Sequence, residues 1–514
     1  MPADTHRVCW LHAKMTSSPL PPDLHMPSNL MNYIKRLRLI QMISATLLLA
    51  ACGSNGVMTS AEKQPAGDEI VQQIEEQVGI YPAEFLTAYV DAVGRRLIAG
   101  LATTPYYFRF RIIDQGEPNA FSTANGYIYI SRGLLALINS EDELAGILAH
   151  QIVHVTQRHH MQQDRRDNQP GVLVLPGQII NKVVAADISQ TIKAQLGEAG
   201  KAHTATYDLD QENQADRLGM QMAARAGYNP IALATALYNL ERTVRLLPDE
   251  QHESAFFTSH PTTPERITDI EREAENILWT PAQPFAQSKQ DLLDRLNGLS
   301  WGANNPMQGI LQDQQFMQPD MDISIQFPAG WNAVNTPIFV GAFAPNNQAL
   351  IILGSAERPG SVAEVAADFL TELSSEEGLE PTSTDSVELD IGPAYLVQLE
   401  DTSGELPASI YYMWVNTRGT TFRFIAAGTD LFRDQLRDTV LSLRNMTSEE
   451  KASIANDHIR TITANAGESI QELSERTGNL FSPEMTTAVN GLPDITTLKQ
   501  HQLIKILYRE PYLR

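Results

Sequence analysis

The sequence predicts a multidomain α+β protein, and three observations carry this prediction. The chain has 514 residues, which at about 150 residues per domain indicates roughly three domains. Helical apolar spacing dominates up to about Trp279, whereas alternating strand-like patterns begin near Met321. The last segment has a strand–helix–helix–strand rhythm. We therefore expect a mainly α-helical domain over 68–280, a linker over 281–294, an α/β sandwich over 295–446 and a small βααβ domain over 459–507.

The composition excludes several classes of protein. Hydrophobic residues make up 43% and charged residues 19% of the chain, which argues against a disordered, collagen-like or polytopic membrane protein. The formal net charge of −23 argues against nucleic acid as a partner, because phosphate binding needs clustered Lys and Arg. The only cysteines are Cys9 and Cys52, so a disulfide-rich scaffold is excluded.

Residues 31–53 have the pattern of an export signal. Basic residues precede an apolar stretch over Leu39–Ala51, which is shorter than a membrane span. The stretch ends at Cys52 and resembles a bacterial lipoprotein signal. This resemblance implies that the Cys52 thiol is lipidated and that Gly53, as the next residue, directs the protein to the outer membrane, facing the periplasm. The alternative is an ordinary signal peptide with an incidental cysteine.

The first thirty residues fit poorly in front of a signal peptide, because they contain Trp10 and several prolines without any periodic pattern. Met26 or Met31 is the expected initiator. We therefore divide the N-terminal part into a doubtful start plus lipoprotein signal over 1–52 and a polar spacer over 53–67.

The strongest chemical signal lies in a helix expected over 141–160. His150 and His154 are four residues apart, so their imidazoles project from one helical face and can share one Zn²⁺. Apolar residues around them predict that the helix is buried. Taken alone, the pair is a weak signal, because helical histidines more often only form hydrogen bonds.

A second helix supplies candidates for the rest of the site. Glu212 can provide a carboxylate oxygen as third ligand and leave a fourth position for water, as in catalytic zinc sites. Asp216 follows one turn later and is suited to hold a histidine ring N–H. Taken alone, Glu212 would be a solvated acid near a helix N-terminus.

Several blocks in order along the chain resemble the BepA-like zinc metallopeptidases of the bacterial periplasm, which are relatives of HtpX and the CaaX prenyl protease. The resemblance covers roughly residues 70–275 and implies a zincin-type peptidase domain with a small edge-strand sheet and one Zn²⁺ per chain. The blocks that carry it are Asn119-Ala120-Phe121, the segment 126–135, the histidine pair with the residues up to His159, Ala215-Asp216-Arg217-Leu218-Gly219, the segment 226–230 and the segment 259–266.

The resemblance also implies roles for further residues. His260 matches a histidine that can approach the zinc in resting enzymes, and Arg266 matches an arginine suited to polarising the reacting carbonyl. Substrate peptide is expected to add as a strand to an edge strand beside the cleft, made here of Gly126, Tyr127, Ile128, Tyr129 and Ile130.

Gln151 departs from the family pattern, in which this position is the glutamate that takes a proton from the attacking water. A neutral amide can orient water but cannot accept its proton, and loss of a general base typically costs about 10²–10⁴-fold in rate. Metal binding should survive, since this residue is not a ligand. An engineered trap, a natural loss of activity and a single-base error each explain Gln151; the untagged precursor sequence favours a natural substitution or an error.

The downstream segments carry no catalytic pattern. Residues 295–446 contain no clustered His, Cys or acid–base pair, so we assign them no chemistry. Residues 459–507 weakly resemble a LysM module, which implies binding of peptidoglycan. Gln500-His501 replaces the Pro-Gly of many such modules, and a small packing domain without glycan affinity fits equally well.

Two functions therefore compete. The first is an envelope zinc metalloendopeptidase that acts on unfolded or misassembled periplasmic and outer-membrane polypeptides, with activity reduced or lost because of Gln151. The second is a zinc-binding pseudo-protease that acts as a chaperone or assembly factor, anchored to membrane and peptidoglycan. A plain peptidoglycan-tethering lipoprotein is a third possibility.

Overall fold

The structure is a computed structural model, and it describes residues 71–512 except for 73, 77, 102–105, 161–206, 248–254, 346–347, 357–359, 378–379, 403–406 and 495–496. The described residues belong to one compact unit, Lys63–Arg514. The predicted signal sequence, the lipidation site Cys52 and the spacer 53–67 lie outside the described residues.

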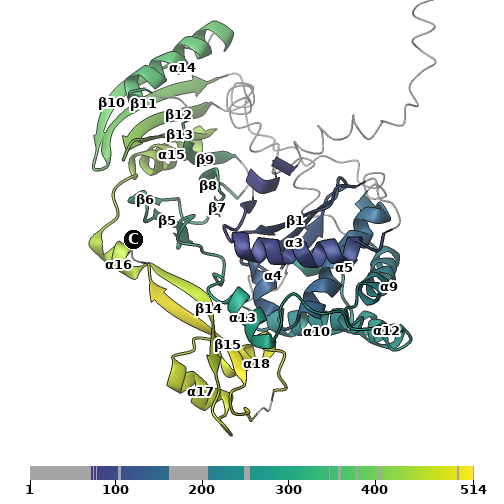
Figure 1. Cartoon of the computed structure of the whole chain (residues 1–514). Helices are drawn as coiled ribbons and strands as arrows, with labels where there is room; N and C mark the ends of the chain where they lie inside the picture. Colours follow the sequence, from purple (N-terminus) through teal and green to yellow (C-terminus); the bar gives the residue numbers. More distant parts are fainter. Residues whose placement is uncertain are drawn as a thin grey trace, which may run out of the picture. The chain divides into compact units, whose positions relative to one another are not determined.

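A helical region with a small sheet forms the first part of the described chain (Figure 1). The sheet has the order β1-β3-β2, with β3 parallel to β1 and antiparallel to β2. The elements of this region are α3 (Glu84–Ile98), β1 (Arg109–Ile113), β2 (Ala120–Ser122), β3 (Tyr127–Ser131), α4 (Arg132–Leu137), α5 (Glu141–Thr156), α9 (Leu209–Arg225), α10 (Ala232–Val244), α11 (Ala255–Ser259) and α12 (Pro264–Ala274).

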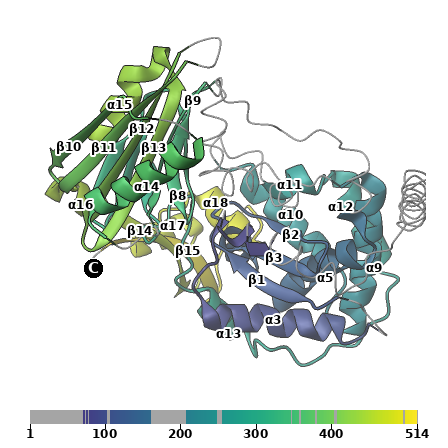
Figure 2. The same cartoon turned by 90° about the horizontal axis from the view of Figure 1, so that it is seen from above.

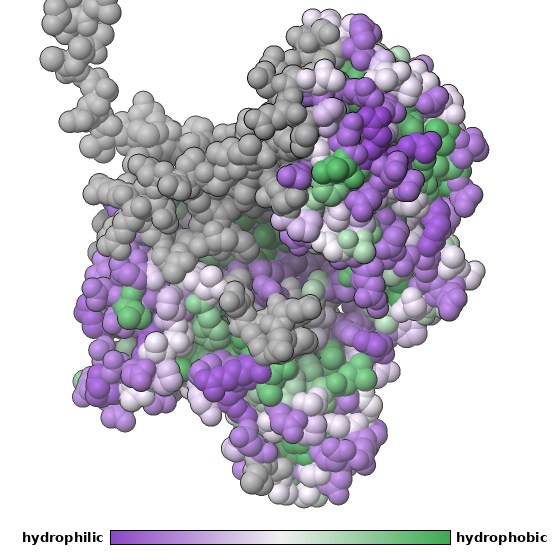
Figure 3. Space-filling model, turned by 180° about the vertical axis from the view of Figure 1, so that it is seen from behind, coloured by the Kyte–Doolittle hydropathy of each residue, from purple (hydrophilic) through white to green (hydrophobic). Residues whose placement is uncertain are grey.

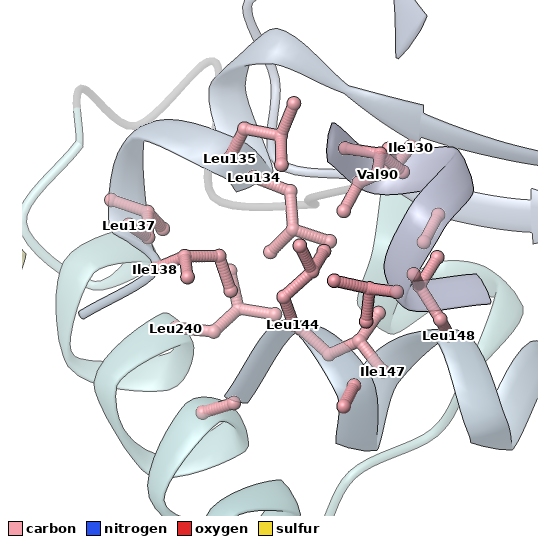
Figure 4. Packing of buried hydrophobic residues seen from close by; sticks show 14 of the residues in the cluster. Val90, Ile130, Leu134, Leu135, Leu137, Ile138, Leu144, Ile147, Leu148 and Leu240 are labelled. Atoms are coloured by element: carbon pink, nitrogen blue, oxygen red, sulfur yellow. The ribbon is translucent and has the colours of Figure 1, made fainter. Parts of the chain in front are cut away.

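The helix α5 lies in the largest hydrophobic core of the protein. Ser140 caps its N-terminus by accepting a hydrogen bond from the Glu143 backbone N–H. Figure 4 shows Leu144, Ile147 and Leu148 of α5 packed among residues of α3, β3, α4 and α10. The expected burial of this helix is therefore present, although the helix ends at Thr156 rather than at residue 160.

Close packing of α9 on α5 sets the position of the two histidines. A Cβ atom on Gly219 would lie 3.1 Å from the His150 backbone nitrogen and 3.2 Å from the His150 Cα atom. These distances are tighter than ordinary van der Waals contact, so a side chain at this position would require the two helix backbones to move apart by a few tenths of an ångström. The same approach brings the first turns of α9 against the histidine face of α5.

The prediction that Gly126–Ile130 forms an edge strand is wrong. Tyr127–Ser131 is β3, the central strand of the sheet, and Ile128, Tyr129 and Ile130 are paired on both sides. The prediction failed because β2 is only three residues long and carries no alternating pattern that would reveal it in the sequence. In the described part of the sheet, β2 rather than β3 lies at the border.

The linker expected over 281–294 is also shorter than predicted. The helix α13 (Lys289–Leu296) begins within it, with the Ser288 side chain accepting a hydrogen bond from the Asp291 backbone N–H. Leu292, Leu293 and Leu296 are buried in the main core. Their helical spacing overrides the flexible composition of the residues before them.

A large antiparallel sheet occupies the middle of the chain, as the predicted α+β class requires. Its seven strands have the order β10-β11-β12-β13-β9-β8-β7. A second sheet has the order β4-β5-β6. The elements are β4 (Ile310–Gln312), β5 (Gln315–Gln318), β6 (Ile323–Gln326), β7 (Asn332–Asn335), β8 (Phe339–Phe343), β9 (Ala349–Ser355), α14 (Val362–Glu377), β10 (Ser383–Leu389), β11 (Gly392–Asp401), β12 (Ala408–Thr417), β13 (Thr420–Thr429), η3 (Asp430–Phe432) and α15 (Arg433–Leu441).

The two helices of this region cover opposite faces of the seven-stranded sheet (Figures 1 and 2). Tyr411 and Met413 of β12 pack in one core with Leu436 of α15, whereas Tyr412 of β12 packs in the other core with Val365 of α14. This alternation is the period of two that a sheet buried on both faces requires.

The last segment has the predicted strand–helix–helix–strand order. It contains α16 (Ser448–Ser453), β14 (Ala455–Thr463), α17 (Ile470–Thr477), α18 (Pro483–Val489) and β15 (Leu503–Pro511), with β14 antiparallel to β15. Phe481, Met485 and Val489 belong to the same hydrophobic core as α5 and α10. This segment is therefore packed against the helical region rather than tethered beside it.

Among the described residues, no helix is both long and apolar enough to cross a bilayer. On the face shown in Figure 3, hydrophobic and hydrophilic residues are interspersed. Exposed apolar side chains such as Phe85 and Leu278 occur, as is normal for folded proteins.

Lys505 of β15 has a buried amino group at the contact between the last segment and the helical region. Its Nζ donates hydrogen bonds to the Ala136 and Ile138 carbonyl oxygens at 2.7 and 3.0 Å. Burial lowers the pKa of Lys505 to about 7, although the nearby Glu143 acts in the opposite direction and Lys289 adds to the lowering. The buried amino group thus ties β15 to the end of α4.

We expect Lys505 to make stability depend on pH. Because its pKa is lower in the folded state than the ordinary value of 10.5, the unfolded chain binds the extra proton between about pH 7 and about pH 10. The free energy of unfolding should therefore rise with pH across this window, by on the order of 1–3 kcal/mol. Urea unfolding at about pH 7 and about pH 9.5 measures the rise, and Lys505→Met should abolish it; an equal rise in both proteins would contradict the assignment.

Candidate metal centre

Helices α5 and α9 bring three of the predicted metal ligands together. His150 Nε2 lies 2.9 Å from His154 Nε2, and Glu212 Oε1 lies 3.3 Å from His154 Nε2. Glu212 Oε2 lies 3.6 Å from His150 Nε2. Zinc–nitrogen bonds of about 2.0–2.1 Å place the ligand atoms of a tetrahedral site about 3.3 Å apart. The three side chains therefore fit a single zinc ion.

His260 completes the cluster. Its Nδ1 lies 2.9 Å from Glu212 Oε1 and 3.3 Å from His150 Nε2. One ligand atom from each of His150, His154, Glu212 and His260 lies within 4.8 Å of the others, and all four side chains are buried. The acid and the three rings thus form one buried cluster, from which His150, His154 and Glu212 can supply donor atoms of the kind that hold a transition metal.

Asp216 lies where the sequence suggested, against one of the histidines. Its Oδ1 is 2.9 Å from His150 Nδ1, so the ring donates to the carboxylate and keeps its Nε2 lone pair toward the cluster. Burial acts to raise the pKa of Asp216, but the Arg266 guanidinium and the bond to His150 outweigh it and hold the pKa below the usual range.

Burial and mutual contacts shift the pKa values of the side chains in the cluster. Burial acts to raise the pKa of Glu212, but His260 and His150 outweigh it and hold the pKa well below its usual range. Burial lowers the pKa of His154 well below the ordinary value, despite its bond to Glu212, and burial likewise lowers the pKa of His260. A carboxylate beside neutral imidazoles is the protonation state that a divalent metal requires.

Arg266 lies buried against two acids of α9. Its guanidinium is 4% exposed and donates from Nε and Nη2 to the Asp216 carboxylate at 2.7 and 2.8 Å. Its Nη1 lies 2.7 Å from Glu212 Oε2 and donates to the Pro261 carbonyl oxygen. The sequence could not show that two acids of α9 would take these donors. In this geometry the guanidinium of Arg266 orders the two acids.

Gln151 connects α5 to β2. Its Nε2 donates to the Ala120 carbonyl oxygen at 3.3 Å and lies 3.1 Å from His260 Nε2. Because a carbonyl oxygen only accepts, the amide nitrogen must face Ala120. His260 Nε2 is then an acceptor, and its Nδ1–H donates to Glu212. Gln151 Oε1 is buried and has no hydrogen-bond partner among the described residues.

The sequence-based prediction of the site did not include four side chains that lie next to the cluster. The Tyr207 ring stacks on His154 with centroids 3.7 Å apart, and its hydroxyl lies 3.0 Å from His160 Nδ1. His159 Nδ1 lies 2.9 Å from His154 Nδ1, and His159 Nε2 lies 2.9 Å from Gln214 Oε1. Tyr207 and His159 stand within or beside the motif blocks, but nothing in the sequence shows which atoms they contact.

Comparison with known proteins agrees with this geometry. Residues 84–274 match the model of peptidase family M48. The chain is 27% identical over 264 residues to the beta-barrel assembly-enhancing protease of Yersinia pestis, covering 49% of this chain and 51% of that protein. It is 26% identical over 227 residues to the protein of the same name from Escherichia coli (strain K12), covering 44% and 46%. The chain therefore spans about half the length of these curated relatives.

More distant similarities cover the same or other parts of the chain. The mitochondrial metalloendopeptidase OMA1 of Schizosaccharomyces pombe is 24% identical over 245 residues, 47% of this chain and 66% of that protein. Among solved structures, cyanobacterial PsbP from Synechocystis sp. PCC 6803 aligns with 28% of this chain and 98% of that chain, at 14% identity and a TM-score of 0.22. The family match includes the two helices that carry the cluster, so residues 84–274 form a peptidase family M48 domain.

Proposed function

We propose that this protein is a zinc metalloendopeptidase-type lipoprotein of the cell envelope that binds unfolded or misassembled envelope polypeptides and hydrolyses them slowly or not at all. One observation carries the proposal: His150, His154 and Glu212 direct ligand atoms to one buried point. The relatives are beta-barrel assembly-enhancing proteases, which supports β-barrel proteins of the envelope as the class of client.

Some residues of the site would hold the metal, others order these ligands, and Gln151 stands at the position of the general base. His150, His154 and Glu212 would hold one zinc ion, whose Lewis acidity polarises a peptide carbonyl when it is bound. Arg266 keeps Asp216 ionised and lies against Glu212, and Asp216 fixes the His150 ring. At the base position, Gln151 can donate a hydrogen bond but cannot accept a proton from water, so the proton-transfer step has no acceptor there.

The contact of Gln151 with the border strand β2 also affects how a substrate polypeptide can pair with this strand. Ser131 N donates to Asn119 O and Thr123 N donates to Tyr127 O, so the alternation of an antiparallel pair turns the polar groups of Ala120 away from β3. The Ala120 carbonyl accepts the Gln151 amide instead. An extended polypeptide that pairs with this carbonyl must displace Gln151, which favours slow turnover.

The same contacts favour a second candidate function, a zinc-binding pseudo-protease that acts as a chaperone or assembly factor. Gln151 fits the site by bonding Ala120 and lying against His260, so the cluster is held together without a base. The anchoring of this protein remains part of the proposal: Cys52 would carry the lipid at the periplasmic face of the outer membrane. The βααβ segment would be a LysM-like module, with peptidoglycan as its ligand.

Zinc content tests the proposal directly. Purified protein dialysed against trace zinc should retain one equivalent, measured by atomic emission, because two oriented imidazoles and a carboxylate suffice for a tight site. His154→Ala should lose the bound zinc, whereas Gln157→Ala, an exposed neighbour one turn beyond on the same segment, should keep it. Wild-type protein without zinc would overturn the proposed function.

Client binding separates the two candidate functions. Unfolded casein should bind the wild-type protein in a zinc-dependent manner and remain intact on a gel over hours. Capture without cleavage that is lost in His154→Ala favours the pseudo-protease, whereas steady zinc-dependent cleavage by the wild-type protein favours the peptidase.

A further inference from the structure

The two histidines of the cluster are held by different partners on their outer sides. His150 Nδ1 faces the Asp216 carboxylate, but His154 Nδ1 faces a third ring, His159, at 2.9 Å. His159 Nε2 in turn faces Gln214 Oε1 at 2.9 Å. His154 is fully buried and His159 is 1% exposed, so bulk water cannot replace either contact.

His154, His159 and Gln214 form a row of hydrogen-bonded side chains. The positions of the hydrogens in this row follow from its last residue, Gln214. Gln214 Oε1 can only accept, so His159 Nε2 carries the hydrogen of that ring and His159 Nδ1 is a lone pair. His159 Nδ1 therefore accepts from His154 Nδ1–H. His154 Nε2 is left with its lone pair, directed toward His150 Nε2 and Glu212 Oε1. Each bond in the row thus favours the tautomer of His154 that can bind a metal.

The opposite direction of the two hydrogen bonds in the row would prevent His154 from binding a metal. If Gln214 turned its amide nitrogen toward His159, both hydrogen bonds would reverse and a hydrogen would stand on His154 Nε2. That hydrogen would occupy the point at which the other two ligand atoms converge. The acceptor at position 214 therefore decides whether His154 offers a lone pair or an N–H to the cluster.

A local reversal of the chain brings His159 under His154. In a continuing helix, a residue five positions later would lie about 140° around the axis and could not face His154. The helix α5 instead ends at Thr156, and Arg158 adopts a φ of 58°. This left-handed conformation costs a non-glycine residue about 1–2 kcal/mol. This cost in conformational free energy is in keeping with a turn that serves a function at the site.

Helix α9 supplies the other anchor. Glu212, Gln214 and Asp216 lie on its first turns, so the helix that offers a ligand also carries the outer partners of both histidines. The capping box of Asp208 and Gln211 fixes the start of α9, and Gln211 Nε2 also lies 3.5 Å from the His159 carbonyl oxygen. The row is therefore built from two segments held in register.

We propose that His159 and Gln214 are positioning residues that set the tautomer and ring orientation of His154 for metal binding. This inference rests on the proposed metal centre. Outer partners of metal-binding histidines typically contribute about 10–100-fold to metal affinity. The effect should pass through His154 alone, because His150 has its own partner in Asp216.

Zinc affinity of the full protein, measured by competition with a chromophoric chelator, tests the proposal. His159→Leu fills the space without an acceptor and should weaken zinc binding by about 10–100-fold. His159→Asn keeps an oxygen near the Nδ1 position and should restore most of the affinity. Gln214→Leu should weaken binding, whereas Gln214→Glu, which can only accept, should bind zinc at least as tightly as the wild-type protein.

Controls separate positioning from simple damage to the fold. Thermal unfolding of the metal-free proteins should be similar for His159→Leu and His159→Asn, and the absorption spectrum of bound Co²⁺ should change only in the leucine variants. Equal zinc affinity of His159→Leu and the wild-type protein would overturn the inference while leaving the metal centre intact. Absence of zinc from the wild-type protein would instead refute the proposed function on which the inference rests.

Discussion

Replacing Gln151 with glutamate is expected to raise the rate of zinc-dependent peptide hydrolysis by about 10²–10⁴-fold. The glutamate carboxylate would place a proton acceptor beside His150 and His154, the proposed metal ligands. The wild-type protein has only the amide of Gln151 at this position. Cleavage of a fluorescent casein by the wild-type protein and by Gln151→Glu, both loaded with one zinc equivalent, measures the gain.

The substitution should also change the hydrogen bonds around position 151. A carboxylate cannot donate to the Ala120 carbonyl, so this border group of β2 becomes free to accept from a polypeptide. The carboxylate can instead accept a hydrogen from His260 Nε2, which leaves Nδ1 as a lone pair toward the cluster. We therefore expect Gln151→Glu to affect both KM and kcat, since strand pairing and proton transfer change together.

Two controls make this result interpretable. The double variant Gln151→Glu/His154→Ala should be inactive, which excludes a contaminating protease. Gln151→Met, which can neither donate nor accept through an amide, should stay inactive while still binding zinc. Equal turnover of the wild-type protein and Gln151→Glu would mean that another group takes the proton and that Gln151 is not the reason for slow catalysis.

The sequence predicts the chemistry of this site better than its geometry. A His-x-x-x-His spacing on a helix fixes which ring faces lie together, and the ordered motif blocks identify Glu212 and Asp216 as companions. These relations are local or carried by the family pattern. Arg266 of α12 finds its partners on α9, and His154 meets His159 through the left-handed turn after α5. No local spacing in the sequence encodes these contacts.

The same distinction holds for the fold. Helix α5, whose apolar residues recur with helical spacing, begins at Glu141 as expected and ends four residues earlier than expected. The central position of β3 was missed because strand order depends on pairing between segments, and β2 has too few residues to show a period. The βααβ order of the last segment was expected, but its burial through Lys505 and Phe481 was not, since packing between segments distant in sequence leaves no local signal.

Asp114→Ala is expected to lower the free energy of unfolding by about 3–5 kcal/mol, because it leaves a buried cation without its partner. Arg132, the first residue of α4, is fully buried, and its Nε donates to Asp114 Oδ1 at 2.5 Å. Its Nη1 donates to the carbonyl oxygens of Ser300 and Gly302 at 2.8 and 2.9 Å. The pair thus joins the peptidase region to the segment that leads into the sheet region.

Urea unfolding at neutral pH measures this loss, and a double variant tests its cause. Arg132→Met/Asp114→Ala removes both charges and should recover part of the stability, because replacing a buried pair by apolar groups is often nearly neutral. A double variant no more stable than Asp114→Ala would mean that the bonds from Arg132 to Ser300 and Gly302 matter more than the charge. Zinc affinity should stay unchanged in both variants, since neither residue contacts the cluster or its outer partners; a parallel loss of zinc would show that the position of α5 depends on this distant pair.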